Sequence, residues 1–171
     1  MQLLLKQIDE DGMKSIGYSL WRDENESLQW LDTKEPKSVV YVNFGGIIVM
    51  TAEQLVESAM GLADSNHSFS WIIRPDLVIG DSAILPAEFE ADIQIRGFIT
   101  SWCPQEEVLN HPPAGGFLTH SGRGSTIESL SAGVPMACWP LFADQKLTVD
   151  KLAKNGELAW RLITILSKGI K

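Results

Sequence analysis

Short apolar runs alternate with helix-like segments along most of the chain, and this alternation constrains the fold more than any other feature. The run SVVYVNF at residues 38–44 consists mostly of β-branched and aromatic residues, which is typical of a strand buried on both faces of a parallel sheet. Two glycines end it. Residues 51–65 follow as an amphipathic helix, with Thr51 as its N-cap and an apolar face at Leu55, Ala59 and Leu62.

The same order continues toward the C-terminus. Further strands are expected over residues 69–74, 97–102, 114–120 and 134–140, and further helices over residues 85–93, 104–111 and 125–132. Residues 146–157 predict a helix and residues 158–166 a final strand or helix, while a short helix is expected near residues 27–32. Strands that alternate with helices predict an α/β fold with at least five mostly parallel strands and right-handed crossovers.

Composition limits the class of partner and the compartment. The 171 residues suit one domain, and a net charge of −8 disfavours nucleic acid and anionic membranes. No apolar run approaches the length of a membrane span, and the N-terminal residues resemble neither a signal peptide nor an anchor. Cys103 and Cys138 are too few for a disulfide scaffold and have no zinc spacing, so they are interpreted as reduced thiols of a cytoplasmic protein.

The glycine-rich stretch THSGRGSTIESLSAGVP, residues 119–135, is the best candidate for a ligand site. A helix is expected to open near Ser125, where free amides and the positive end of the dipole attract anions. Gly122 and Gly124 would let a ligand approach the backbone; the alternative is that both only turn the chain and that Ser125 only caps the helix. A dinucleotide-binding oxidoreductase is disfavoured because Ile127 stands where a third glycine is needed, and a P-loop lacks its Gly-Lys-Ser/Thr.

Taken together, residues 102–145 resemble the signature box of plant secondary-product UDP-glycosyltransferases. The shared motifs are WCPQ, VLNH, FLTHSG, a Ser and a Glu at fixed spacing, GVP and a closing Asp-Gln. The stretch WLDTKEPKSVVYVNFGG also resembles the start of that family's C-terminal domain. The resemblance implies a Rossmann-like sheet with flanking helices, as in the C-terminal half of a two-domain GT-B glycosyltransferase. Residues 1–37 would be a linker or arm and residues 38–171 the UDP-sugar donor-binding domain.

The resemblance also implies a role for each matching residue. Trp102 would stack on uracil, the Cys103 backbone would read the base edge, and Gln105 and Glu128 would bind the ribose hydroxyls. His120 and Ser125 would hold the diphosphate at the helix start, with Gly122, Arg123 and Gly124 in the same loop and Thr51 nearby. Asp144 and Gln145 would bind the sugar, and a closing Gln resembles the glucose-using members. The implied partners are UDP-glucose or another UDP-sugar and a small-molecule acceptor, with no cofactor and no metal.

Two departures from the family pattern bear on activity. Arg123 and Gly124 replace a Trp-Asn pair, and losing the Asn amide removes a hydrogen bond to phosphate worth about 1.5–3 kcal/mol. The family's catalytic His and its Asp partner belong to a preceding N-terminal domain, and His67 and His111 are no substitute for that base. The sequence therefore predicts either the donor-binding half of an inverting glycosyltransferase, with no catalytic residue in this chain, or a non-catalytic nucleotide-binding module or inactive fragment.

Overall fold

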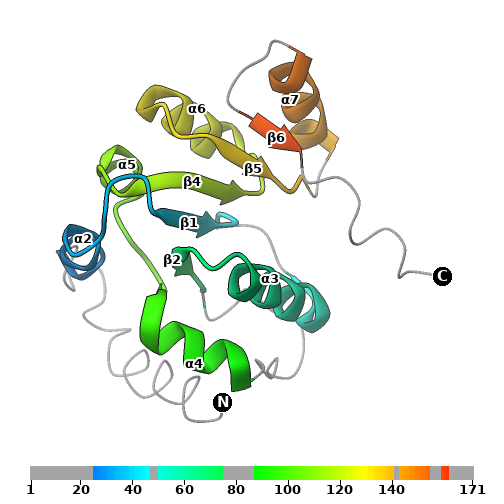
Figure 1. Cartoon of the computed structure of the whole chain (residues 1–171). Coiled ribbons are helices and arrows are strands. Elements are labelled where there is room, and N and C mark those ends of the chain that lie inside the picture. The colour runs from blue at the N-terminus through cyan, green and yellow to red at the C-terminus, as the bar shows by residue number, and fades with distance from the viewer. Residues whose placement is uncertain (1–24, 47–49, 75–86, 141–142, 155–158, 162–171) are drawn as a thin grey trace, which may run out of the picture.

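A parallel β-sheet forms the centre of the molecule (Figure 1). The structure, a computed structural model, describes residues 25–46, 50–74, 87–140, 143–154 and 159–161. Within them the strands are β1 (Val39–Asn43), β2 (Ser68–Ile72), β3 (Gly97–Thr100), β4 (Ala114–Thr119), β5 (Met136–Cys138) and β6 (Ala159–Arg161). They lie in the order β3-β2-β1-β4-β5-β6, and every neighbouring pair is parallel. The predicted α/β fold with a parallel sheet is confirmed.

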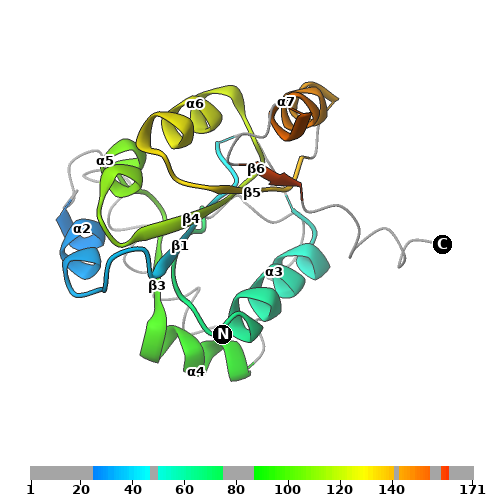
Figure 2. The same ribbon diagram turned by 45° about the horizontal axis from the view of Figure 1, so that its top comes forward.

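Helices cover both faces of this sheet (Figure 2). They are α2 (Asn25–Asp32), α3 (Ala52–Asp64), α4 (Ala87–Arg96), α5 (Gln105–Asn110), α6 (Arg123–Ala132) and α7 (Ala143–Lys154). Side chains of α3 and α4 pack on one face, and those of α2, α5, α6 and α7 pack on the other. Both faces of the central strands are therefore buried, which explains why β1 is a largely apolar run in the sequence.

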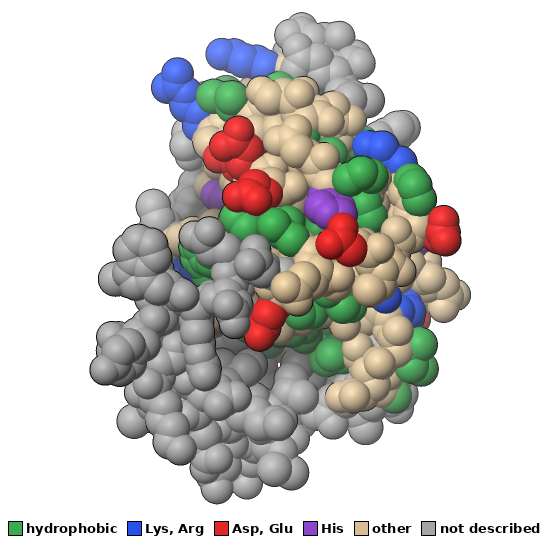
Figure 3. Space-filling view, turned by 90° about the vertical axis from the view of Figure 1, so that its left-hand side faces the viewer, with side chains coloured by type: hydrophobic (Ala, Val, Ile, Leu, Met, Phe, Trp, Pro, Cys, Tyr) green, Lys and Arg blue, Asp and Glu red, His purple; other side chains and the backbone are tan. Residues whose placement is uncertain are grey.

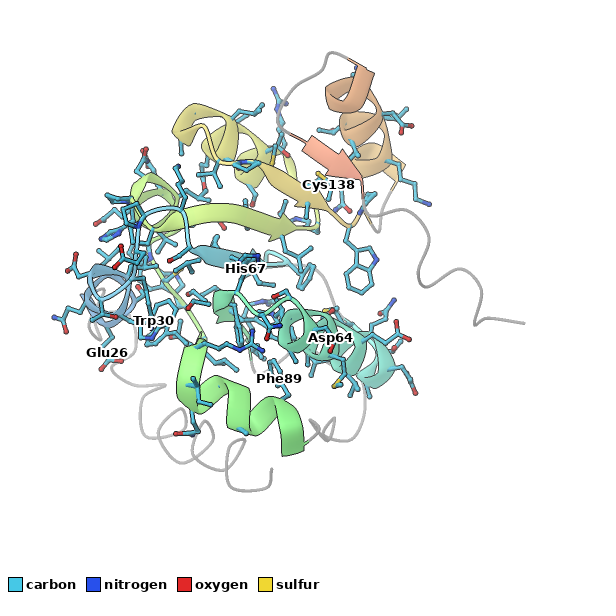
Figure 4. The ribbon with its side chains drawn as sticks, viewed as in Figure 1. Glu26, Trp30, Asp64, His67, Phe89 and Cys138 are labelled. Atoms are coloured by element: carbon cyan, nitrogen blue, oxygen red, sulfur yellow. The ribbon has the colours of Figure 1, made fainter. Side chains whose placement is uncertain are left out.

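Alternation along the strands divides the core into two clusters. Tyr41 of β1 packs on the face of the sheet that α5 covers, whereas its neighbour Val42 packs on the face that α3 covers. The predicted apolar face of α3 is confirmed, because Leu55, Ala59 and Leu62 are all buried. On the same side Phe89 of α4 packs against Phe69 and Trp71 of β2 (Figure 4).

Helix α6 differs from the sequence prediction at its start. The prediction placed the first residue at Ser125, but the helix begins at Arg123 with Gly122 as its N-cap. The Thr126 amide donates to the Gly122 carbonyl at 2.9 Å, which closes the first turn around Gly124. Glycine is a poor helix former, so the pattern indicated a loop where the backbone is helical. The segment that follows β5 forms helix α7 and then strand β6.

Helix α2 lies within the predicted linker but packs on the domain. Its Leu31 belongs to the buried core, and the Asp32 carboxylate lies 3.3 Å from Nε2 of His111 after α5. The domain boundary at residue 38 stays a prediction.

Acidic side chains are spread over the face that carries α2 and α5, with hydrophobic side chains between them (Figure 3). In the part of the chain that the structure describes, no helix is long and apolar enough to cross a membrane.

Candidate functional site

The carboxyl ends of the strands lie along one edge of the sheet, and the order of the strands reverses between β1 and β4. From β1 the chain passes to β2 and β3 on one side, while β4, β5 and β6 extend the other side. Ligands of open α/β sheets bind at such a reversal. The segments that follow β1, β3 and β4 are residues 44–46, 101–104 and 120–122, and they contain four of the residues that the sequence singled out, Trp102, Cys103, His120 and Gly122.

Gln105, the first residue of α5, links β1 to α6. Its Oε1 accepts hydrogen bonds from Nδ2 of Asn43 at 2.9 Å and from the Tyr41 hydroxyl at 3.2 Å. Its Nε2 donates to Oε2 of Glu128 at 2.6 Å and to Oγ of Ser125 at 3.1 Å. We call these five residues the Gln105 cluster. It brings three predicted site residues, Gln105, Ser125 and Glu128, into direct contact.

Beneath the Gln105 cluster lies an uncharged interior. The Tyr41 hydroxyl is 3.2 Å from Sγ of Cys103, and both side chains are buried. Burial is the largest cause that raises the pKa of Tyr41 far above its ordinary value, and burial also raises the pKa of Cys103 to about 11. Both groups are therefore protonated at neutral pH, so the Cys103 thiol is a structural contact and not a reactive thiolate.

His120 lies directly after β4 and is packed between two glycines. A Cβ on Gly45 would come within 2.5 Å of Cε1 of the imidazole, and a Cβ on Gly122 would strike its Nε2. Gly45 also has a backbone φ of +74°, a conformation that residues other than glycine rarely adopt. The glycines on both sides are required because the ring occupies the space that a side chain would need.

The start of α6 is open to a ligand. Its N-cap is Gly122, no side chain caps the helix, and its first turn holds no acidic residue. Arg123 and Gly124 are exposed, and a Cβ added to Gly124 would meet no atom within 4 Å. The first amides of the helix and the positive end of its dipole therefore face an open region, which suits an anion.

Trp102, after β3, is 57% exposed although it is a large hydrophobic residue. The Thr100 hydroxyl donates to its carbonyl at 3.1 Å and so fixes the backbone at the strand end. An exposed indole on an ordered backbone can stack on a flat ring. The arrangement as a whole offers a stacking surface, a carboxamide–carboxylate pair and an anion site along one edge of the sheet.

Comparisons with known proteins identify the family of the chain. The family model described as UDP-glucoronosyl and UDP-glucosyl transferase matches residues 24–169. The chain belongs to this family. The UDP-glycosyltransferase resemblance of residues 102–145 is thereby confirmed.

Two similar relatives of this UDP-glycosyltransferase chain are 7-deoxyloganetin glucosyltransferases. The Gardenia jasminoides protein is 60% identical, with 100% of this chain and 38% of the relative covered. The Catharanthus roseus protein is 59% identical, with 85% of this chain and 30% of the relative covered. The chain thus spans about a third of the length of these relatives.

Solved structures of plant UDP-glycosyltransferases confirm the Rossmann-like α/β fold. Phytolacca americana UGT2, solved with UDP-2fluoro-glucose and pterostilbene, superimposes with a TM-score of 0.76 at 38% identity. The match covers 88% of this chain and 33% of that one. The described part of this UDP-glycosyltransferase chain therefore has the fold of a region of a larger, ligand-binding enzyme.

The remaining predicted residues lie on other elements. Thr51 caps α3, where its Oγ1 accepts a hydrogen bond from the Gln54 amide at 3.3 Å. Gln145 is buried in the first turn of α7. Asp144 precedes it on the same helix, and its side chain lies outside the described residues. The roles of these three in sugar or phosphate binding stay predictions.

Sequence reasoning missed Tyr41 and Asn43, which both hydrogen-bond to Gln105. The run over residues 38–44 was interpreted only as a buried strand. A signal was present, because residues two apart on a strand share a face and Asn43 is the one amide side chain in that run, next to its carboxyl end. A polar residue in that position of an α/β sheet points toward the ligand edge.

Proposed function

We propose that the chain is the UDP-sugar-binding half of an inverting glycosyltransferase, which transfers glucose from UDP-glucose to a hydroxyl of a small molecule. The observation that carries this proposal is the contact of Gln105 with Ser125 and Glu128 next to the uncapped start of α6. This contact places a hydroxyl-binding pair beside an anion site, at the point where the order of the strands reverses. The family membership of residues 24–169 supplies the class of ligand.

The nucleoside would occupy the side of the site that carries Trp102. Uracil stacks on the exposed indole, and the backbone at Cys103 contacts the edge of the base. The Glu128 carboxylate and the Gln105 amide, 2.6 Å apart, bind the ribose hydroxyls. A carboxylate accepts two hydrogen bonds from neighbouring hydroxyls, and the amide can donate to a ribose oxygen that replaces Ser125 as the partner of its nitrogen, so the pair suits a diol.

The diphosphate would lie at the start of α6, held by the first amides of the helix, the Ser125 hydroxyl and His120. Gly122 keeps the approach clear, and the helix dipole and Arg123 favour the anion without a metal ion. Thr51 is proposed to lie near the diphosphate, although its oxygen already accepts from Gln54. Asp144 and Gln145 at the start of α7 are proposed to bind the sugar hydroxyls.

In the proposed reaction a base removes the proton of the acceptor hydroxyl, whose oxygen attacks the anomeric carbon of the sugar. The bond from that carbon to the β-phosphate oxygen breaks, UDP leaves, and the configuration inverts. The anion site stabilises the charge on the leaving diphosphate.

None of the chain's three histidines suits the role of base. His111 pairs with Asp32, His67 is exposed after α3, and His120 packs between glycines at the diphosphate.

We therefore assign no catalytic residue to the 171 residues and propose that the base and the acceptor pocket lie outside them. A second candidate function is a nucleotide-binding module that does not transfer sugar. The exposed Gly124 favours it, because an open first turn of α6 lacks the amide side chain that the family pattern places there. We also propose a cytoplasmic location, since both cysteines are free thiols and thiols persist in reducing compartments.

Calorimetric titration of the chain with UDP and UDP-glucose tests the proposal. Binding is expected, and Trp102→Ala should weaken it by about tenfold or more because base stacking contributes about 1–3 kcal/mol. Trp102→Phe should retain most of the affinity. Ile95→Ala is the matched control, since Ile95 is an exposed apolar residue of α4 at 77% exposure. No binding at millimolar UDP would refute the proposal.

A further inference from the structure

The hydrogen bonds around Gln105 have a direction that begins at a backbone amide. The N–H of Gly45 donates to Oδ1 of Asn43 at 2.8 Å. A backbone N–H can only donate, so the Asn43 atom that faces it must be the oxygen. The amide nitrogen of Asn43 must then face the other way, toward Gln105 and Tyr41.

Gln105 takes its orientation from Asn43. Nδ2 of Asn43 donates to Oε1 of Gln105 at 2.9 Å and to the Tyr41 hydroxyl at 3.0 Å. If Gln105 were turned over, its nitrogen would face another nitrogen, and its oxygen would face the Glu128 carboxylate. Both contacts would be repulsive, so a donor is held toward Glu128.

We propose that Asn43 is a positioning residue for ribose recognition. The hydrogen bonds form a series that runs from the Gly45 N–H through Asn43 and Gln105 to Glu128. The series has a backbone donor at one end and an acceptor-only carboxylate at the other, so only one orientation of the two amides satisfies every hydrogen bond. It presents the amide of Gln105 and the carboxylate of Glu128 to the ribose in fixed orientations. This inference rests on the proposed function, and Asn43 itself acts through Gln105 without touching the ligand.

The same loop joins the two parts of the donor site. Gly45, which orients Asn43, also packs against the imidazole of His120. The turn after β1 therefore supports the ribose-binding pair on one side and the residue at the diphosphate on the other. A change in the turn is expected to alter both, whereas a change in the Asn43 amide alters only the ribose side.

The substitution Asn43→Asp should reverse the orientation of the Gln105 amide, although Asp and Asn side chains have almost the same shape. The new carboxylate can still accept from the Gly45 N–H but cannot donate to Gln105, so the Gln105 amide turns over and its oxygen faces Glu128. We expect the Kd for UDP of the whole chain to rise about tenfold or more. Asn110→Asp is the matched control, because the Asn110 amide is exposed and donates to the Glu106 carbonyl of its own helix. It should leave the Kd unchanged.

The pH dependence separates positioning from simple damage. Protonation of the new carboxyl restores a donor toward Gln105. The ratio of the Asn43→Asp Kd to the wild-type Kd should therefore fall as the pH is lowered from about 7 to about 4, toward the ordinary pKa of an Asp carboxyl. The ratio is used because the phosphate of UDP titrates in the same range. A constant ratio would overturn the proposal.

The nucleotide 2′,3′-dideoxy-UDP tests the link to ribose. It lacks both hydroxyls, so it should bind the wild type more weakly, and Asn43→Asp should weaken it no further. If Asn43→Asp does not fold, Asn43→Ala removes the donor without a charge and should weaken UDP binding about threefold to tenfold, again with no effect on the dideoxy nucleotide. Equal losses for both nucleotides, or none, would overturn the role of Asn43. Failure of the wild type to bind UDP would instead refute the proposed function.

Discussion

Helices α3 and α6 come after β1 and β4, the two central strands of the sheet, yet their first turns are built in opposite ways. Thr51 caps α3 in a complete capping box, in which its side chain accepts from the Gln54 amide and the Gln54 side chain accepts from the Thr51 amide. The first turn of α3 contains the acid Glu53. Helix α6 begins at Gly122 with no side-chain cap, no acid and an exposed Arg123.

The reason for the difference lies next to α6. A serine or threonine at position 122 would need space that the His120 ring occupies. The cap that stabilises α3 is thus excluded at α6, and the amides there remain available for an anion. Two helix ends with the same backbone physics serve folding in one case and binding in the other. Four variants test this contrast, from the largest expected effect to the smallest.

Gly122→Ser would give α6 the kind of start that α3 has. The new Cβ displaces His120, and the hydroxyl competes with phosphate for the helix amides, so the Kd for UDP should rise roughly a hundredfold in calorimetric titration. Gly61→Ala is the matched glycine control. It lies in α3 with no atom within 4 Å of the added Cβ, and should stabilise the fold by about 0.5–1 kcal/mol without affecting UDP. Unchanged binding in Gly122→Ser would contradict the contrast.

Arg123→Trp combined with Gly124→Asn restores the family's residues in the first turn of α6. The open space at Gly124 accommodates the amide, which can donate to phosphate. The affinity for UDP-glucose should increase by roughly tenfold, the equivalent of one hydrogen bond to a charged group. Transfer of glucose to a phenol or alcohol should still be absent from the chain alone. An unchanged Kd would show that the departure at these two positions does not limit binding.

Thr51→Ala removes the cap of α3 and should lower the free energy of unfolding by about 1 kcal/mol in urea titration. Thr51→Ser keeps the oxygen and should keep the stability. The Kd for UDP, measured on the same samples, is expected to change far less than in Gly122→Ser. An equal loss of affinity would mean that the start of α3 contributes as much to diphosphate binding as the start of α6.

Glu53→Gln gives the smallest effect, visible through its pH dependence. Hydrogen bonds from its own backbone and from the Thr51 hydroxyl lower the pKa of Glu53. Such a carboxylate adds stability above its unfolded pKa of about 4.3, and that stability is lost as the pH falls through the lower folded pKa. The difference in unfolding free energy between wild type and variant should be present at about pH 7 and vanish near pH 3. A difference that persists in acid would exclude the charge as its cause.

Much of the fold could be predicted because its causes are local. The apolar run over residues 38–44, the N-cap Thr51 and the left-handed Gly133 that ends α6 each follow from neighbouring residues alone. The start of α6 could not be predicted in this way. Gly124 lowers the local helix propensity, and the space around Gly122 is set by His120, whose position depends on the turn at Gly45.

The same distinction between local and tertiary causes applies to the candidate site. The sequence by itself determined which side chains are candidates for a UDP-sugar, because the family motif of residues 102–145 carries their identities and spacing. Only the tertiary structure decided how they meet. Asn43, Gln105 and Glu128 come from β1, α5 and α6, and parallel pairing of β1 with β4 brings those elements to one edge. Periodicity reports which face of its own element a residue occupies, whereas a hydrogen bond between elements depends on how the strands are ordered.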